Sequence, residues 1–299
     1  ARVVTGLGAS AEHARCVAES LVESNLAGHD SHGVMKLPSY VRDARAGKLR
    51  VAATPVVVKQ TPTTALIDGM GGFGHVGAQA AVDVATAKAR ECGLALVAVS
   101  HCHHTGRLGR WSERIAAAGM IGIAMGAEAR PPYLVAPYGG RHGALSTNPV
   151  TVAVPRRASP PILVDYATSA VSIGKLQMAR VTGESIPDGW VIDAEGRPTT
   201  DLDAYFGRGY LLPFGAYKGF GLGVVAELLA VGLSGGDQAP PGERSSCLSI
   251  LALDIAAVRD RDDFDQFVDT VAARIHAVPP REPGRAVLLP GEPETRARR

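Results

Sequence analysis

Gly72-Phe73-Gly74-His75-Val76-Gly77 matches the pattern G-x-G-x-x-G and lies between an expected strand over 64–68 and an expected helix over 76–92. In Rossmann dinucleotide-binding folds, the strand after such a helix ends in an acidic residue that holds a ribose hydroxyl. Here that strand ends in Val97-Ala98-Val99-Ser100-His101, which contains no acid. The sequence therefore favours a glycine-rich turn that brings a helix and a strand close together, and it argues against a Rossmann site.

Short apolar segments alternate with helical segments along most of the chain. The expected strands cover 64–68, 94–100, 120–126, 150–154, 162–166 and 248–255. The expected helices cover 11–27, 38–47, 76–92, 107–118, 170–182, 218–233 and 262–276. Strands that alternate with helices predict an α/β fold whose sheet is covered on both faces.

The overall composition is typical of a soluble globular protein, with 46% hydrophobic and 20% charged residues in 299. A net charge of +2 gives no reason to expect a nucleic-acid or membrane partner. No apolar run reaches the roughly 18 residues that span a bilayer. The four cysteines follow no C-x-x-C spacing, which favours the reducing cytoplasm.

Gly28-His29-Asp30-Ser31-His32-Gly33 places two imidazoles, a carboxylate and a hydroxyl at the end of the first expected helix. Histidine titrates near neutral pH, and a neighbouring Ser or Asp can orient it, so this segment is a candidate for proton transfer. The alternative is a capped helix end with surface histidines, and the segment alone leaves both open.

A second polar cluster, Ser100-His101-Cys102-His103-His104, follows an apolar strand. Three histidines and a cysteine raise the possibility of zinc, but adjacent residues point in different directions and no further ligand set lies nearby, so we expect no metal. Gly106-Arg107-Leu108-Gly109 opens the next helix and is better suited to an anion, because backbone N–H groups and a guanidinium converge there. A surface arginine at a glycine-rich helix start is the alternative.

Three charged residues farther along the chain each allow two interpretations. Asp165 ends an apolar strand and could cap a helix or bind ribose hydroxyls. Lys175 and Lys218 each lie in or before a helix and suit a phosphate or carboxylate, although a solvated lysine is the default.

Nine segments, taken together, point to one family: Gly28-His29-Asp30-Ser31-His32-Gly33-Val34, Leu37-Pro38-Ser39-Tyr40-Val41, His104-Thr105-Gly106-Arg107-Leu108-Gly109, Ser146-Thr147-Asn148-Pro149, Asp165-Tyr166-Ala167-Thr168-Ser169, Gly174-Lys175, Leu212-Pro213-Phe214-Gly215, Tyr217-Lys218-Gly219 and Leu289-Pro290-Gly291-Glu292. With these segments the chain resembles the type-2 malate/L-lactate dehydrogenase family of NAD(P)-dependent oxidoreductases. Within that family it is most similar to the hydroxycarboxylate dehydrogenase B branch. The segments follow the family's order and run nearly end to end.

The resemblance implies a fold other than Rossmann, namely a mixed β-sheet cofactor domain with helical N- and C-terminal parts, usually in a homodimer. In this chain we expect a helical N-terminal part over 1–60 and an NAD(P)-binding α/β domain over 61–245. The segment 218–233 is expected to pack on the N-terminal part. A returning strand and a helical part, shorter than in the relatives, are expected over 246–299.

The resemblance also implies residue roles. His32 matches the family's proton donor or acceptor, Ser31 its relay partner, and His104 a second histidine near nicotinamide and substrate. Lys175 completes the expected catalytic group, and Lys36, Tyr40 and Thr147 are expected to bind the substrate. The expected contacts to NAD or NADP are Gly106, Arg107, Leu108, Val164, Asp165, Tyr166, Ala167, Tyr217, Lys218, Gly291 and Glu292.

Two departures from the family pattern bear on the substrate. Many members carry Arg where this chain has Lys36, and Lys cannot form the same bidentate contact with a carboxylate. The imine-reducing branch carries an acid where this chain has Lys175, which favours 2-oxo and 2-hydroxy acids over cyclic imino acids. We therefore expect hydride transfer between NAD(P)H and a small 2-oxo acid, with His32 as the first candidate for the proton donor. A cyclic imino acid reductase and, more distantly, a metal-dependent hydrolase or lyase are the alternatives.

Overall fold

The computed structural model describes residues 1–239 and 245–298 of the chain. Its α-helices are α1 (Arg2–Gly6), α2 (Ala11–Leu26), α3 (Leu37–Arg45), α4 (Gly74–Cys92), α5 (Gly109–Ala117), α6 (Ile173–Thr182), α7 (Leu202–Arg208), α8 (Tyr217–Glu227), α9 (Arg261–His276) and α10 (Glu292–Ala297). The strands are β1 (Val56–Gln60), β2 (Thr64–Asp68), β3 (Leu94–Cys102), β4 (Met120–Glu128), β5 (Val150–Val154), β6 (Ile162–Tyr166), β7 (Val191–Ile192), β8 (Pro198–Thr199), β9 (Tyr210–Leu211) and β10 (Ser246–Asp254). Single helical turns add η1 (Asp30–His32), η2 (Val34–Lys36), η4 (Gly236–Gln238) and η5 (Ile255–Ala257), and η3 (Leu228–Gly232) is a π-helical extension of α8.

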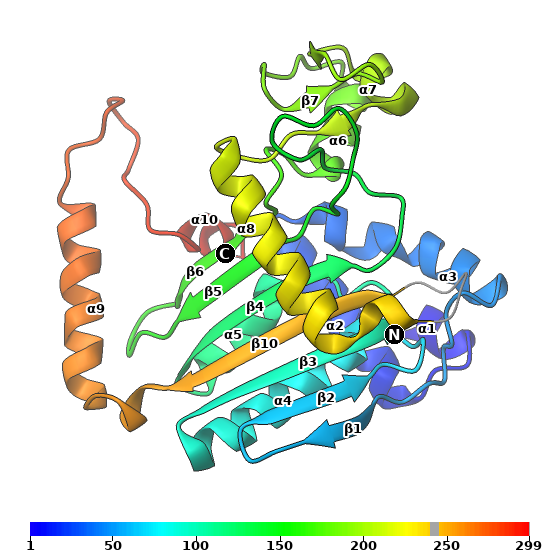
Figure 1. Ribbon diagram of the computed structural model, residues 1–299. Coiled ribbons are helices and arrows are strands. Elements are labelled where there is room, and N and C mark those ends of the chain that lie inside the picture. The colour runs from blue at the N-terminus through cyan, green and yellow to red at the C-terminus, as the bar shows by residue number, and fades with distance from the viewer. Residues whose placement is uncertain (240–244, 299) are drawn as a thin grey trace.

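A seven-stranded sheet in the order β1-β2-β3-β10-β4-β5-β6 forms the centre of the molecule (Figure 1). Among the described strands of this sheet, β2 and β3 form the one parallel pair, and all other neighbours run antiparallel. The central strand β10 returns from the C-terminal third of the chain. The predicted mixed sheet is therefore confirmed, and so is the expectation of a fold other than Rossmann.

Helices cover both faces of this sheet. On one face α4 packs on β2, β3 and β10, and α5 packs on β4 and β5. The alanines Ala78, Ala81, Ala85 and Ala89 form the buried side of α4, and their small side chains let the helix lie close to the strands. On the other face α8 and η3 lie across β4 and β10 (Figure 1).

Local signals in the sequence explain where several elements begin and end. The Ser10 hydroxyl caps α2 by accepting the backbone N–H of His13 at 3.1 Å, and the left-handed Gly28 (φ +79°) follows its end. The Ser172 hydroxyl caps α6 in the same way, so this helix begins three residues later than the expected 170. The helix expected over 107–118 begins at Gly109, which leaves Arg107 in the preceding loop.

The sequence pattern missed β1 and the small sheet β8-β7-β9. All five residues of β1 are exposed at the edge of the sheet, so its Val56-Val57-Val58 run has no alternation to reveal it. Strands β7, β8 and β9 have two residues each and are shorter than any periodicity can register. They belong to a separate apolar cluster with α6 and α7, which includes Leu176, Val191 and Leu211.

The proposed division at residues 60 and 245 stays a prediction. The strand β1 of the N-terminal part and β10 of the C-terminal part both join the large sheet, so the three parts share it. The elements that α8 contacts most are β4 and η3, and the packing of 218–233 on the N-terminal part also stays a prediction.

Candidate active site

The segment after α2 forms a short, braced turn that presents Ser31 and His32. The side-chain oxygen of Asn25 accepts the backbone N–H of Val34 at 2.9 Å, which closes the turn. The Ser31 hydroxyl lies 2.9 Å from Nδ1 of His32. Since one ring nitrogen is held by Ser31, proton exchange with a substrate would use Nε2 of His32.

The loop that follows β3 carries the second histidine, His104. His101 takes a left-handed conformation (φ +52°) where the chain leaves the sheet. A Cβ atom on Gly74 would overlap the carbonyl oxygen of His103 and lie 2.7 Å from that of His104. Gly74 therefore permits the close approach of α4 to this loop, which confirms the structural interpretation of the G-x-G-x-x-G pattern.

Helix α3 fixes the two histidines of this loop. The Tyr40 hydroxyl lies 2.7 Å from Nδ1 of His104, and the Asp43 carboxylate lies 3.0 Å from Nε2 of His103. Tyr40 and Asp43 are three residues apart and so lie on one face of the helix. Tyr40 is only 1% exposed, so its contact with His104 is shielded from solvent.

His32 and His104, which come from distant parts of the chain, face one another. Their rings stack with centroids 5.5 Å apart and an interplanar angle of 27°. Burial is the main cause that lowers the pKa of His32 to about 4, and Lys36, His29 and Arg107 make smaller contributions to that value in the same direction. His32 is therefore neutral near pH 7 in the absence of a bound anion.

The histidines of the β3 loop do not converge on one point. His101 Nδ1 lies 3.1 Å from the Asp68 carboxylate, whereas His103 and His104 face the two α3 side chains just described. Across residues 1–239 and 245–298, no group of three or more His, Cys, Asp and Glu side chains is placed to hold a metal ion. The zinc alternative thus receives no support from the geometry.

Arg107 is buried between two carboxylates. Its guanidinium donates to Asp165 Oδ2 at 3.3 Å and to Glu113, which also accepts from Arg298 at 2.9 Å. Asp165 in addition accepts the backbone N–H of Gly109 at 3.0 Å, so it caps α5 across the fold. Burial raises the pKa of Asp165, and the neighbouring Arg107 opposes that rise.

The predicted cofactor segments offer groups that suit a nicotinamide dinucleotide. Arg107 Nε is buried and has no hydrogen-bond partner among the described residues, which makes it a candidate donor to a cofactor oxygen. The rings of Tyr166 and Tyr217 are exposed and can pack on flat heterocycles. Lys218 is exposed at the first turn of α8, where it can approach a phosphate.

The segment 289–292 runs beside the strand that ends in these groups. The carbonyl oxygen of Pro290 accepts the backbone N–H of Leu163 at 3.0 Å, next to Val164 on β6. Gly291 has φ +91°, and a Cβ there would lie 2.8 Å from Cβ of Leu163. The Glu292 carboxylate accepts the backbone N–H of Leu289 at 3.0 Å. The structure thus brings the last predicted cofactor segment next to residues 164–167.

The two lysines expected near the substrate lie on different elements, η2 and α6. Lys36 lies one turn beyond His32 and is the charged side chain with the largest effect on its pKa. A Cβ on Gly174 would overlap the Ser31 side chain, so the first turn of α6 lies against Ser31. Lys175, the next residue, is exposed.

Thr147 belongs to a segment tied to its neighbours through the backbone. Its carbonyl oxygen accepts the backbone N–H of Thr168 at 2.9 Å and the Thr168 hydroxyl at 3.1 Å. The following residue, Asn148, has φ +37° and donates to Glu227 on α8 at 2.8 Å. Substrate binding by Thr147 stays a prediction.

Sequence reasoning missed the contacts made by the C-terminal helix. Glu294 lies 3.3 Å from Nε2 of His29, and Arg298 pairs with Glu113 behind Arg107. No local motif marks these residues, because their partners lie 265 and 185 positions away in the sequence. The short helix α10 thereby connects the turn that holds His32 with the loop that holds Arg107.

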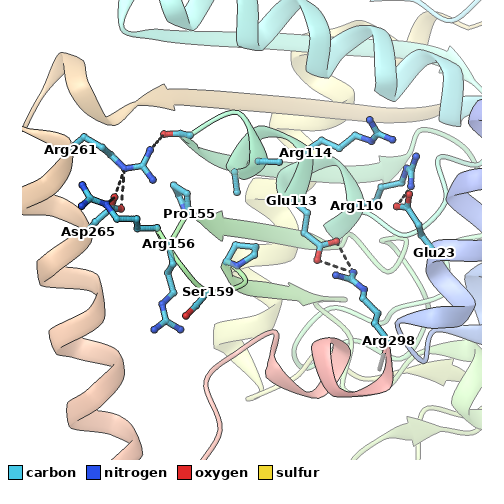
Figure 2. A pocket seen from close by; sticks show the side chains of 15 residues that line it. Glu23, Arg110, Glu113, Arg114, Pro155, Arg156, Ser159, Arg261, Asp265 and Arg298 are labelled. Carbon is cyan, nitrogen blue, oxygen red and sulfur yellow. Dashed lines mark hydrogen bonds and ion pairs between the residues drawn. The ribbon is translucent and has the colours of Figure 1, made fainter.

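A cavity of about 890 Å³ lies between α5, the loop 155–161, the start of α9 and the end of α10 (Figure 2). Its charged side chains pair with each other, as in Arg110 with Glu23 and Arg261 with Asp265. No predicted site residue lines it.

The comparisons with known proteins define an oxidoreductase, built on a mixed sheet other than Rossmann. The sequence model of the malate/L-lactate dehydrogenase family matches residues 1–299, and the chain belongs to that family. Hydroxycarboxylate dehydrogenase B of Escherichia coli (strain K12) is 36% identical over 305 residues, which cover 98% of this chain and 83% of that protein.

Two solved structures show the same fold. Malate dehydrogenase from Entamoeba histolytica superimposes with a TM-score of 0.92 at 26% identity and covers 99% of this chain and 87% of its own. The delta1-piperideine-2-carboxylate reductase from Pseudomonas syringae has a TM-score of 0.89 at 29% identity, with coverages of 99% and 89%. In the part of the chain that the structure describes, none of the helices is both long and apolar enough to span a membrane.

Proposed function

We propose that this protein is an NAD(P)-dependent dehydrogenase that interconverts a small 2-hydroxy carboxylic acid and its 2-oxo acid. The observation that carries the proposal is the pair of stacked imidazoles, His32 and His104, each with Nδ1 on a hydroxyl group. Family membership and the similarity to a hydroxycarboxylate dehydrogenase support the reaction class.

The protein's own residues would bind the cofactor and move a proton. When bound, the nicotinamide ring supplies or accepts a hydride. Arg107, Lys218 and the rings of Tyr166 and Tyr217 would hold the dinucleotide, with Gly106, Leu108, Val164, Ala167, Gly291 and Glu292 lining it.

The negative charge of the substrate influences the protonation state of the histidine pair. During reduction, negative charge develops on the carbonyl oxygen, and a protonated histidine can stabilise that charge and donate the proton. Lys36 and Lys175 would hold the substrate carboxylate. An anion bound beside His32 raises the pKa of its ring, because the negative charge favours the imidazolium.

Loss of reduced-nicotinamide absorbance tests the reaction class directly. NADH and NADPH are each assayed with pyruvate, oxaloacetate, 2-oxobutanoate, 2-oxoglutarate and a cyclic imino acid. We expect turnover of at least one oxo acid. Turnover of the imino acid alone would favour the reductase alternative, which the fold similarity to the Pseudomonas syringae enzyme keeps open.

Replacing His32 or His104 with Ala should reduce kcat by roughly 100-fold or more, the usual contribution of a general acid or base. Cofactor affinity, measured by nicotinamide fluorescence, should stay nearly constant because neither side chain is expected to hold the dinucleotide. His142→Ala, which removes an exposed histidine, serves as the control. Unchanged turnover in both variants would exclude the histidine pair from catalysis.

We also propose a cytoplasmic homodimer. The outer side of α8 and η3 exposes Val225 and Leu228, the latter 62% exposed, and Leu233 follows them. An exposed apolar strip of this kind is typical of a surface that a second subunit covers. Sedimentation equilibrium measures the oligomeric state.

A further inference from the structure

Tyr40 holds the position behind His104 that an orienting group would occupy. Its ring is buried and packs edge-on against Phe73, His75 and His103, with centroids 5.6 to 5.8 Å apart. The hydroxyl at the end of this packed ring lies 2.7 Å from Nδ1 of His104. A side chain with 1% exposure is poorly placed to bind a substrate that enters from solvent.

The neighbouring contacts of α3 make this geometry rigid. Asp43 lies one turn after Tyr40 and holds Nε2 of the adjacent His103 at 3.0 Å. Gly74 lies against the carbonyl groups of the same two histidines. The His104 ring is thereby held from the helix side and from the backbone side.

We propose that Tyr40 is a positioning residue that accepts the Nδ1–H of His104 and keeps its imidazole in the Nδ1–H tautomer. The Nε2 lone pair of His104 then faces the substrate. This inference rests on the proposed dehydrogenase function for its catalytic meaning, while the tautomer itself is a property of the free protein. The arrangement parallels the contact between Ser31 and Nδ1 of His32.

The proton balance is the same in both directions of the reaction. Where His104 rather than His32 is the acid–base residue, oxidation transfers the substrate O–H proton to Nε2 of His104, and the ring becomes an imidazolium. In reduction, the imidazolium returns the Nε2 proton to the developing alkoxide. The Nδ1–H bond to Tyr40 stays in place throughout, so Tyr40 neither gains nor loses a proton.

Histidine-selective ¹⁵N NMR of the free protein tests the tautomer without any substrate. Comparison with His104→Gln assigns the His104 signals. We expect the wild-type ring in the Nδ1–H form and Tyr40→Phe shifted toward the Nε2–H form. A wild-type ring in the Nε2–H form, or a tautomer that Tyr40→Phe leaves unchanged, would overturn the proposal even if no substrate had been found.

Steady-state kinetics tests the consequence for the reaction. Tyr40→Phe keeps the buried ring and should lower kcat roughly 10- to 100-fold, as expected for one lost buried hydrogen bond, with little change in KM for the oxo acid. The matched control is Tyr205→Phe, in the separate cluster around the small sheet, which should keep wild-type kinetics. A raised KM with unchanged kcat would instead make Tyr40 a substrate contact.

Discussion

At the scale of single residues, the environment of His32 explains why a histidine in a polar segment is not a ready proton donor in the free protein. Burial, and to a smaller degree the neighbouring Lys36, His29 and Arg107, all disfavour its imidazolium form. We expect a bound substrate carboxylate to act in the opposite direction and to favour the imidazolium form of His32. Lys36, which is expected to hold the substrate, thus also lowers the pKa of His32.

Replacing Lys36 with Met should therefore raise the pKa of His32 from about 4 toward its ordinary value of 6.5. The Cε1–H resonance of His32, assigned with His32→Gln, reports the titration. Lys36 directly precedes α3, and Lys48 lies just beyond the other end of that helix. Lys48→Met, which removes this exposed charge, is the control. If the His32 titration is the same in Lys36→Met and wild type, the lysine does not act on this ring.

At the scale of elements, the glycine-rich turn before α4 serves packing. Gly74 meets backbone carbonyl groups of the β3 loop, which cannot move aside without displacing His104. Gly77, one turn later, faces Val99 at ordinary contact distance, 3.4 Å from the Cβ position to the side chain. The two glycines look alike in the sequence pattern but differ in what surrounds them.

Gly74→Ala should destabilise the protein by about 3 kcal/mol, the upper range for overpacking, and should also reduce turnover by shifting His104. Gly77→Ala should change the free energy of unfolding by less than about 1 kcal/mol, because the added methyl group fits and alanine favours the helix. Urea denaturation of both variants measures the difference. Equal effects at the two positions would contradict the proposed close approach.

At the scale of the whole molecule, the C-terminal helix α10 meets two much earlier segments of the chain behind the candidate site. Glu294 reaches His29 beside the His32 turn, and Arg298 reaches Glu113 behind Arg107. The sheet is likewise completed from both ends, by β1 at its edge and β10 at its centre. We therefore expect substitutions in these terminal elements to disturb the geometry of the candidate site.

The buried histidines should also make the folded state sensitive to acid. The pKa of His75 is about 3 because of its burial, whereas an unfolded histidine titrates near 6.5. Below pH 6.5 the unfolded chain binds a proton that the folded chain does not, so stability falls as pH decreases toward 3. The neutral state of His75 alone should lower the free energy of unfolding by about 2 kcal/mol at pH 5 relative to pH 7.

His75→Leu should remove that part of the pH dependence. Urea denaturation at pH 7 and pH 5 compares the two proteins, and the wild type should lose about 2 kcal/mol more than the variant. The exposed His142→Leu should keep the wild-type dependence. An identical loss in His75→Leu would mean that His75 does not stay neutral in the fold.

Much of the site was predictable from local sequence. The Ser31-His32 pair, the glycine-rich turn and the loop 106–109 rest on neighbouring residues, whose contacts are set by short-range geometry. Asp165 was predictable as a cap or a ligand, but its cap is on α5, 56 residues earlier in the chain. The pairing of His29 with Glu294 and of Glu113 with Arg298 had no local signal, because these partners are 265 and 185 residues apart.

The sequence by itself determined the strands and helices with clear periodicity, the absence of a Rossmann acid, and the family through its ordered motifs. Only the tertiary structure decided the sheet order, the facing of His32 and His104, and the burial of Tyr40 against His104. The physical reason is the distance along the chain over which each kind of interaction acts. Periodicity, capping and turn chemistry act over a few residues, whereas burial and charge pairing depend on which distant segments the packed sheet brings together.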